Sequence, residues 1–235
     1  LRRLLHLAFR HGTGAVAVRL PRHAARPIPC FDRAPRVTVP VLDVAAGFDD
    51  ATLTRSARRF PNAILRIEPS SHSIPELQRL QAIGLPIRAY SGARFSSDWV
   101  GFAIAYGAAS IELPTSAAGA NLGLLAEVPA FAIARPSSVK TVRTLLDSGV
   151  SVALGSGFGE PEGRTCSMQE AMRLAVHDGN LDLAEAITLS TVNAAFALGV
   201  GEDRGSLEAG KVADLMVLEI SDYRDLSGYH GVNVV

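Results

Sequence analysis

The chain has 235 residues, of which 48% are apolar and 20% are charged, and its 23 basic residues balance its 23 acidic ones. This length and composition predict one large, well-buried domain, or one with a small appendage. The charge balance excludes an overall field that would attract nucleic acid or an anionic membrane, and no stretch approaches the roughly 18 apolar residues of a membrane span.

Two cysteines, Cys30 and Cys166, are too few for a disulfide framework or a Cys-rich zinc site. Both are typical of reduced thiols, and no secretory signal pattern is found, so we expect a cytoplasmic protein. Residues 1–36 are rich in arginine and contain one acid, Asp32. Aromatic residues do not alternate with these arginines, which favours a solvated edge over a nucleic-acid or acidic-partner surface. We expect neither nucleic acid nor a membrane as partner.

Short, mostly apolar runs recur along the first two thirds of the chain. Runs that are apolar on both faces are typical of a parallel sheet covered by helices. The predicted strands are Gly14–Leu20, Val37–Val44, Ala63–Glu68, Pro86–Tyr90, Ala109–Leu113, Pro129–Ala134 and Ser151–Ser156.

Helical segments lie between or after these strands. Ile74–Ile83 has Ser73 as its cap and Gly84 as its stop, and Val139–Leu146 is closed by Gly149. Repeated strand–helix units predict an α/β fold, either a doubly wound sheet or a (β/α)₈ TIM barrel, and seven strands are one short of a closed barrel.

The pattern changes after residue 166. Three amphipathic helices are predicted over Met168–His177, Leu181–Leu189 and Val192–Leu198. The stretch that follows has turn glycines and short apolar runs, with Ala213–Glu219 as its firmest strand. We therefore expect a barrel over residues 1–200 and a C-terminal β appendage over residues 201–235.

The stretch LSTVNAAFALGVGEDRGSLEAGKVADLMVLE, residues 189–219, resembles the amidohydrolase superfamily. That family reads T-x-N-x-A-x-x-L-G and then D-x-G-S-L-x-x-G-K-x-A-D. The resemblance implies a TIM barrel, here incomplete with about seven strands, followed by a remnant of a small β-sandwich. It also implies that these motif residues are structural and do not touch substrate.

Shorter segments narrow the resemblance to the imidazolonepropionase family, whose members open the imidazolone ring. The segments RHGTGAVAV, AIGLPIRAY, AYGAAS and DYRDLSGYHGVNVV resemble that family at residues 10–18, 82–90, 105–110 and 222–235. The resemblance implies a Zn²⁺ or Fe²⁺ ion at the C-terminal mouth of the barrel. Such an ion lowers the pKa of a bound water and so generates the attacking hydroxide.

The positions that hold this metal in the family are replaced here. Tyr90 stands at the position of a metal histidine, Leu113 at that of a substrate-contacting histidine, and Gly157 at that of the metal-binding, proton-accepting aspartate. The histidine of the family's Gly-Ala-His falls on Ala45 or Ala46, and the family's first strand with His-x-His would lie upstream of residue 1. Gly and Leu offer no lone pair to a cation, so we expect no metal ligand and no cofactor.

Residues outside this pattern give weaker candidates. Glu68 and His72 could form an acid/base pair at the C-terminal end of a strand, although a capping loop around Ser73 is the favoured interpretation. Glu112 is the third catalytic candidate. Ser156 belongs to GSGFGEPEG, a glycine-rich loop that could hold a phosphate. A small molecule at the mouth could use Arg22, Tyr90, Arg94 and Ser156 as ligand-binding residues, but no motif selects one.

Two functions therefore remain open. One is a degenerate imidazolonepropionase-like barrel, metal-free and non-catalytic, that acts as a binding or structural subunit. The other is an active hydrolase of cyclic amide or amidine C–N bonds. An incomplete barrel exposes unpaired strand edges, so we expect a second copy of the chain or another partner chain to cover them.

Overall fold

The computed structural model describes residues 15–20, 37–90, 97–114, 122–158 and 165–234. The chain forms two compact units, which we call the N-terminal unit, residues 15–130, and the C-terminal unit, residues 131–235. Both units contain strands that the sequence predicts, and seven strands are found among the described residues. The α/β fold class is confirmed, and the predicted domain boundary at residue 200 stays a prediction.

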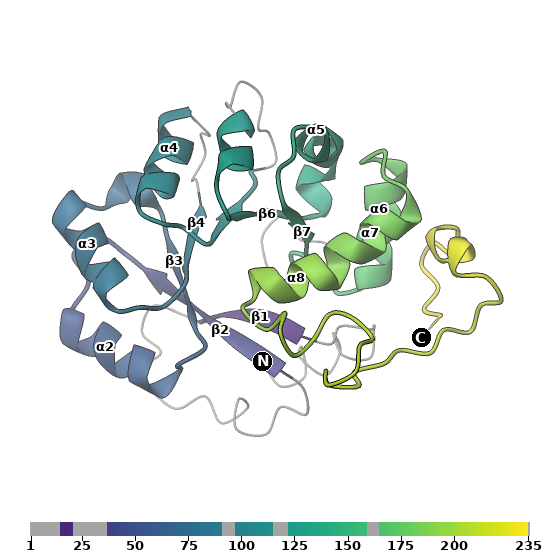
Figure 1. Ribbon diagram of the computed structural model, residues 1–235, viewed down its shortest axis with the longest axis horizontal. Helices are drawn as coiled ribbons and strands as arrows, with labels where there is room; N and C mark the ends of the chain where they lie inside the picture. The colour runs from purple at the N-terminus through teal and green to yellow at the C-terminus, as the bar shows by residue number, and fades with distance from the viewer. Residues whose placement is uncertain (1–14, 21–36, 91–96, 115–121, 159–164, 235) are drawn as a thin grey trace. The chain divides into compact units, whose positions relative to one another are not determined.

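The N-terminal unit is built on five parallel strands whose neighbours follow chain order. They are β1 (Ala15–Leu20), β2 (Val37–Val44), β3 (Ile64–Ile67), β4 (Ile87–Tyr90) and β5 (Ser110–Glu112). Its helices are α2 (Asp50–Arg59), α3 (Ile74–Ala82) and α4 (Ser97–Ala105), with 3₁₀ turns at Pro69–Ser71 and Leu122–Glu127. Figure 1 shows α2, α3 and α4 following one another along one side of the strands.

Alternation along the strands gives this sheet two different faces. Leu65, Ile67, Ala89 and Ile111 are almost completely buried and lie on one face. The helices supply apolar partners of the same kind, such as Leu77 of α3, which is fully buried. The residues that alternate with them form the second face, which carries charge and contains the candidate site.

The C-terminal unit has two parallel strands, β6 (Phe131–Ala134) and β7 (Val152–Leu154), which pair with each other. Four helices follow or separate them: α5 (Val142–Asp147), α6 (Met168–His177), α7 (Leu183–Ser190) and α8 (Val192–Ala197). Two 3₁₀ turns, Pro136–Thr141 and Tyr223–Ser227, complete the unit. Among the described residues, no helix combines the length and apolar character that a bilayer crossing requires.

The amidohydrolase-like motif, residues 189–219, includes α8 and makes several polar contacts within the C-terminal unit. Asn193 donates to the carbonyl of Val152 in β7 at 2.7 Å, and the Lys211 ammonium donates to the carbonyl of Gly201 and to the hydroxyl of Ser206. Arg204 and Asp214 form an ion pair. These contacts agree with the structural role that the resemblance implies for the motif.

The predicted strand Ala213–Glu219 is wrong, because residues 213–219 form no strand in the structure. A strand needs a neighbour to complete its backbone hydrogen bonds. Here Glu219 donates to the carbonyl of Val234, and residues 215–218 have no backbone hydrogen bond to another described residue. Residues 201–234 therefore run as turns and extended chain, and the expected β-sandwich remnant is not formed.

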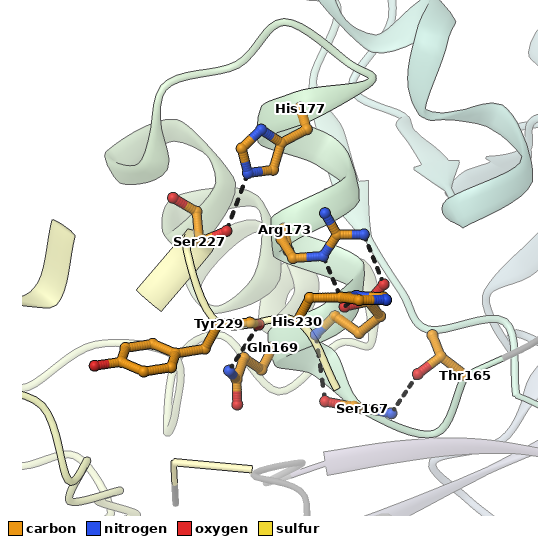
Figure 2. A network of polar contacts seen from close by, with 9 residues as sticks. Thr165, Ser167, Gln169, Arg173, His177, Ser227, Tyr229 and His230 are labelled. Atoms are coloured by element: carbon orange, nitrogen blue, oxygen red, sulfur yellow. Dashed lines mark hydrogen bonds and ion pairs between the residues drawn. The ribbon is translucent and has the colours of Figure 1, made fainter. Parts of the chain in front are cut away.

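The C-terminal segment is attached to α6 instead. The amide of Gln169 accepts from the backbone N–H of Val234 and donates to the carbonyl of Tyr229. The ring of His177 contacts the Ser227 carbonyl at 3.0 Å (Figure 2). Leu226 and Val234 are buried, so apolar packing and polar contacts act together.

Candidate functional site

Four charged side chains lie on the polar face of the N-terminal unit's sheet. Asp43 of β2, Arg66 of β3 and Arg88 of β4 are register partners, and Glu112 of β5 lies two residues beyond the register partner of Arg88. Because alternate residues of a strand share a face, all four belong to the same face. We call this group, together with Tyr90, the Arg66 cluster.

Arg66 is the centre of the cluster. Its Nε and one terminal nitrogen donate to the two carboxylate oxygens of Glu112, each at 2.8 Å, and its other terminal nitrogen donates to Asp43 at 3.1 Å. The guanidinium carbon lies 3.7 Å from the centroid of the Tyr90 ring. A forked, bidentate ion pair that also stacks on an aromatic face is a contact that arginine makes and lysine cannot reproduce.

The electrostatics of the two arginines differ. Burial disfavours the charged form of Arg66, but the hydrogen bonds and charges of Glu112 and Asp43 outweigh burial, so the pKa of Arg66 is raised above its ordinary value. Burial lowers the pKa of Arg88 and outweighs the charge of Glu112, which raises it, while the like charge of Arg66 lowers it further. Arg88 is 6% exposed and donates to the hydroxyl of Ser110 at 3.1 Å.

The predicted catalytic residues are only partly brought together. Glu112 and Tyr90 meet at Arg66, whereas Glu68 and His72 lie in the turn after β3. Nδ1 of His72 contacts the main-chain carbonyl of Glu68 at 3.0 Å, and the Glu68 carboxylate accepts from the Ser71 hydroxyl. His72 is buried, and its Nε2 has no hydrogen-bond partner among the described residues. An acid/base role for this pair stays a prediction.

The remaining ligand-binding candidates are separated from this cluster by chain position or lie outside the described residues. Ser156 follows β7 in the C-terminal unit, where its hydroxyl accepts from the backbone N–H of Phe158 at 3.4 Å. Arg22 and Arg94 fall outside the described residues. Phosphate binding by the glycine-rich loop also stays a prediction, because residues 159–164 of that loop are not described.

The residues that the resemblance places at metal-binding or substrate-contacting positions, and the neighbouring Glu112, make a poor set of metal ligands. Leu113 is fully buried and apolar, and Gly157 has no side chain. The Tyr90 ring lies against a guanidinium, and both oxygens of Glu112 accept hydrogen bonds from Arg66. In the part of the chain that the structure describes, no group of three or more His, Cys, Asp or Glu side chains could hold a metal ion. The donor set therefore does not fit the Zn²⁺ or Fe²⁺ ion that the resemblance implies.

Sequence reasoning missed Asp43, Arg66 and Arg88. The available signal was the presence of one charged residue inside each of three otherwise apolar strands. Charges at such positions are almost always paired when they are buried. Which strand supplies the partner depends on the register, and the register became known only from the structure.

Comparison with known proteins identifies the family of the chain from its sequence. Residues 114–232 match the amidohydrolase family. The chain is 33% identical over 164 residues to imidazolonepropionase from Solibacter usitatus, covering 66% of this chain and 39% of that protein. It is 32% identical over 179 residues to imidazolonepropionase from Deinococcus radiodurans, covering 72% and 45%. The chain thus spans less than half the length of these relatives.

Solved structures show the same fold. A Xaa-Pro dipeptidase with bound methionine superposes with a TM-score of 0.74 at 16% identity, covering 96% of this chain and 74% of that one. An enamidase, described as a member of the amidohydrolase superfamily, gives a TM-score of 0.74 at 13% identity, covering 96% and 70%. At these identities the likeness shows the fold alone.

Proposed function

Because the chain belongs to the amidohydrolase family and is imidazolonepropionase-like within it, we propose that it is a degenerate member of that family, metal-free and non-catalytic. On this proposal it acts as a binding or structural subunit. The observation that carries the proposal is the Arg66 cluster, in which Glu112 and Tyr90 are both engaged by a guanidinium. The resemblance implies that hydrolysis in the family depends on a metal-bound hydroxide, and among the described residues no group of three or more His, Cys, Asp or Glu side chains could hold a metal ion.

The charges of the cluster support a site that needs no ion. Two guanidinium groups, from Arg66 and Arg88, accompany two carboxylates, from Asp43 and Glu112, so the formal charges cancel. A divalent cation added beside them would leave two uncompensated positive charges in a buried region. Uncompensated buried charge is among the most costly features a fold can contain.

We also propose that the partner is a second copy of this chain, which pairs with the extended segment of residues 211–219. Leu215 is 60% exposed and Val217 is 84% exposed, which is unusual for residues of an apolar, strand-forming sequence. Antiparallel self-pairing centred on Leu215 places Lys211 opposite Glu219, Val212 opposite Leu218 and Ala213 opposite Val217. Such pairing joins opposite charges at its ends and apolar residues inside. It also places Asp214, which pairs with Arg204 of its own chain, opposite Met216 in an isologous interface.

A cytoplasmic location remains part of the proposal. Cys166 is a free thiol in the structure, and a reducing compartment suits it.

Metal analysis and turnover of the purified full chain test the proposed function. We expect far less than one equivalent of zinc or iron and no turnover of imidazolone propionate, with the Deinococcus radiodurans imidazolonepropionase as the positive control. Stoichiometric metal together with turnover would overturn the proposal and favour the active hydrolase of cyclic amide or amidine C–N bonds.

A further inference from the structure

We propose that the Arg66 guanidinium is the resident cation of this site, which holds Asp43 and Glu112 and keeps divalent metal ions away from them. The inference rests on the proposed function and adds the residue responsible for it. It assigns to Arg66 the charge-neutralising role that a metal ion has in a metalloenzyme. Arg66 is thus a positioning residue for the cluster and has no part in catalysis.

The guanidinium of Arg66 occupies the carboxylate oxygens that a metal ion would need. Both oxygens of Glu112 accept from Arg66 at 2.8 Å, and one oxygen of Asp43 accepts at 3.1 Å. Carboxylate oxygens are the ligands that hard divalent cations such as Mn²⁺ prefer. A metal ion that bridged Glu112 and Asp43 through these oxygens would lie where the guanidinium now lies, so arginine and metal compete for one position.

The charged side chains of Asp43, Glu112 and Arg66 are largely shielded from water. The side chains of Asp43 and Glu112 are 9% and 11% exposed, and that of Arg66 is 6% exposed. Water therefore cannot replace the guanidinium as the partner of both carboxylates. Without Arg66 the cluster would keep two buried carboxylates against the single guanidinium of Arg88, so one negative charge would lack compensation.

The Tyr90 ring makes a further favourable contact with the guanidinium of Arg66. A guanidinium 3.7 Å from the ring centroid gains from the negative face of the ring as well as from the acids. The two acids and the aromatic ring thus converge on one cation from three strands, β2, β4 and β5. Lysine at position 66 would keep the charge but would lose the fork that engages both oxygens of Glu112.

Three variants of the full chain separate a resident cation from a merely structural arginine. Arg66→Met removes the charge at similar length, Arg66→Lys keeps the charge, and the triple variant Arg66→Met, Asp43→Asn, Glu112→Gln removes the acids as well. The readouts are the midpoint of thermal unfolding with and without millimolar MnCl₂, and Mn²⁺ binding by equilibrium dialysis.

We expect Arg66→Met to lower the unfolding midpoint by about 10 °C, because a buried ion pair loses one partner in a chain of this size. Mn²⁺ should bind this variant and raise its midpoint, while the wild type, Arg66→Lys and the triple variant should neither bind Mn²⁺ nor respond to it. An Arg66→Met variant that binds no Mn²⁺ would overturn the inference while leaving the proposed function intact.

Failure of the proposed function has a different signature, namely stoichiometric zinc or iron in the purified wild type. If Arg66→Met does not fold, its refolding from urea with and without MnCl₂ gives the same test. Refolding of the variant only when MnCl₂ is present supports Arg66 as the resident cation. Failure to refold both with and without MnCl₂ overturns the inference.

Discussion

The carboxylate of Glu76 accepts three hydrogen bonds at the start of α3. Protonation of Glu76 would weaken them, so their contribution to stability depends on pH. The carboxylate accepts from the Ser73 hydroxyl at 2.7 Å, from the Ser73 N–H at 2.8 Å and from the Gly47 N–H at 2.6 Å. The Ser73 hydrogen bonds, followed by that of Gly47, lower the pKa of Glu76 from 4.5 to about 2. A lowered folded-state pKa stabilises the fold above the unfolded value and loses that contribution as the pH falls through the folded value.

We therefore expect Glu76→Gln to be less stable than the wild type at neutral pH, with the difference shrinking as the pH falls from about 4.5 to about 2. Urea unfolding at a series of pH values measures this, and Glu127→Gln, an exposed glutamate of the same unit, serves as control. Parallel stability curves for the wild type and Glu76→Gln would contradict the expectation.

Gly157 lies at a backbone conformation that disfavours any side chain. Its φ is +66°, and a Cβ atom there would lie 3.3 Å from Cδ of Arg135. We expect Gly157→Ala to lower the free energy of unfolding by about 1 kcal/mol, because a side chain disfavours left-handed backbone. Gly155→Ala is the matched control, since a Cβ at Gly155 meets only the Ala134 carbonyl, at 4.0 Å. Equal unfolding midpoints for the two variants would contradict the backbone argument.

At the scale of elements, Gln169 connects α6 with the end of the chain. Its amide accepts from the N–H of Val234. It also donates to the carbonyl of Tyr229 (Figure 2). Gln169→Leu keeps the size and removes both bonds, each worth about 1 kcal/mol net. We expect amide hydrogen exchange in residues 229–234 to become about tenfold faster. Thr188→Val, which removes a surface hydroxyl contact on α7, should leave that exchange unchanged.

All seven strands were predicted from the sequence, because continuous apolar runs are a strong signal, whereas α2 and α4 were not. Only Leu53 of α2 is buried, so its apolar stripe is too sparse to mark a helix. The last seven residues of α4, WVGFAIA, are apolar with no polar residue at regular spacing. The predicted strand at Ala213–Glu219 had the right composition, but strand formation depends on a neighbour that a local pattern does not contain.

At the scale of the whole molecule, the sequence pointed to single positions of a candidate site but not to the charged group that the fold assembles. Tyr90 and Gly157 could be found by motif position alone. Asp43, Arg66 and Glu112 come from three strands spread over about a third of the chain, and only the parallel register brings them together. Charge compensation of this kind is a property of the folded sheet.

The extended segment of residues 211–219 gives the prediction that tests the second copy. If two copies pair antiparallel about Leu215, light scattering after size exclusion should give roughly twice 24.8 kDa for the wild type. Leu215→Lys would place two like charges opposite each other at the centre of the pair, so we expect it to be monomeric. Val232→Lys, at another exposed apolar residue outside the segment, should leave the dimer intact. A wild type that remains monomeric across a dilution series would exclude self-pairing and leave a different chain as the partner of this segment.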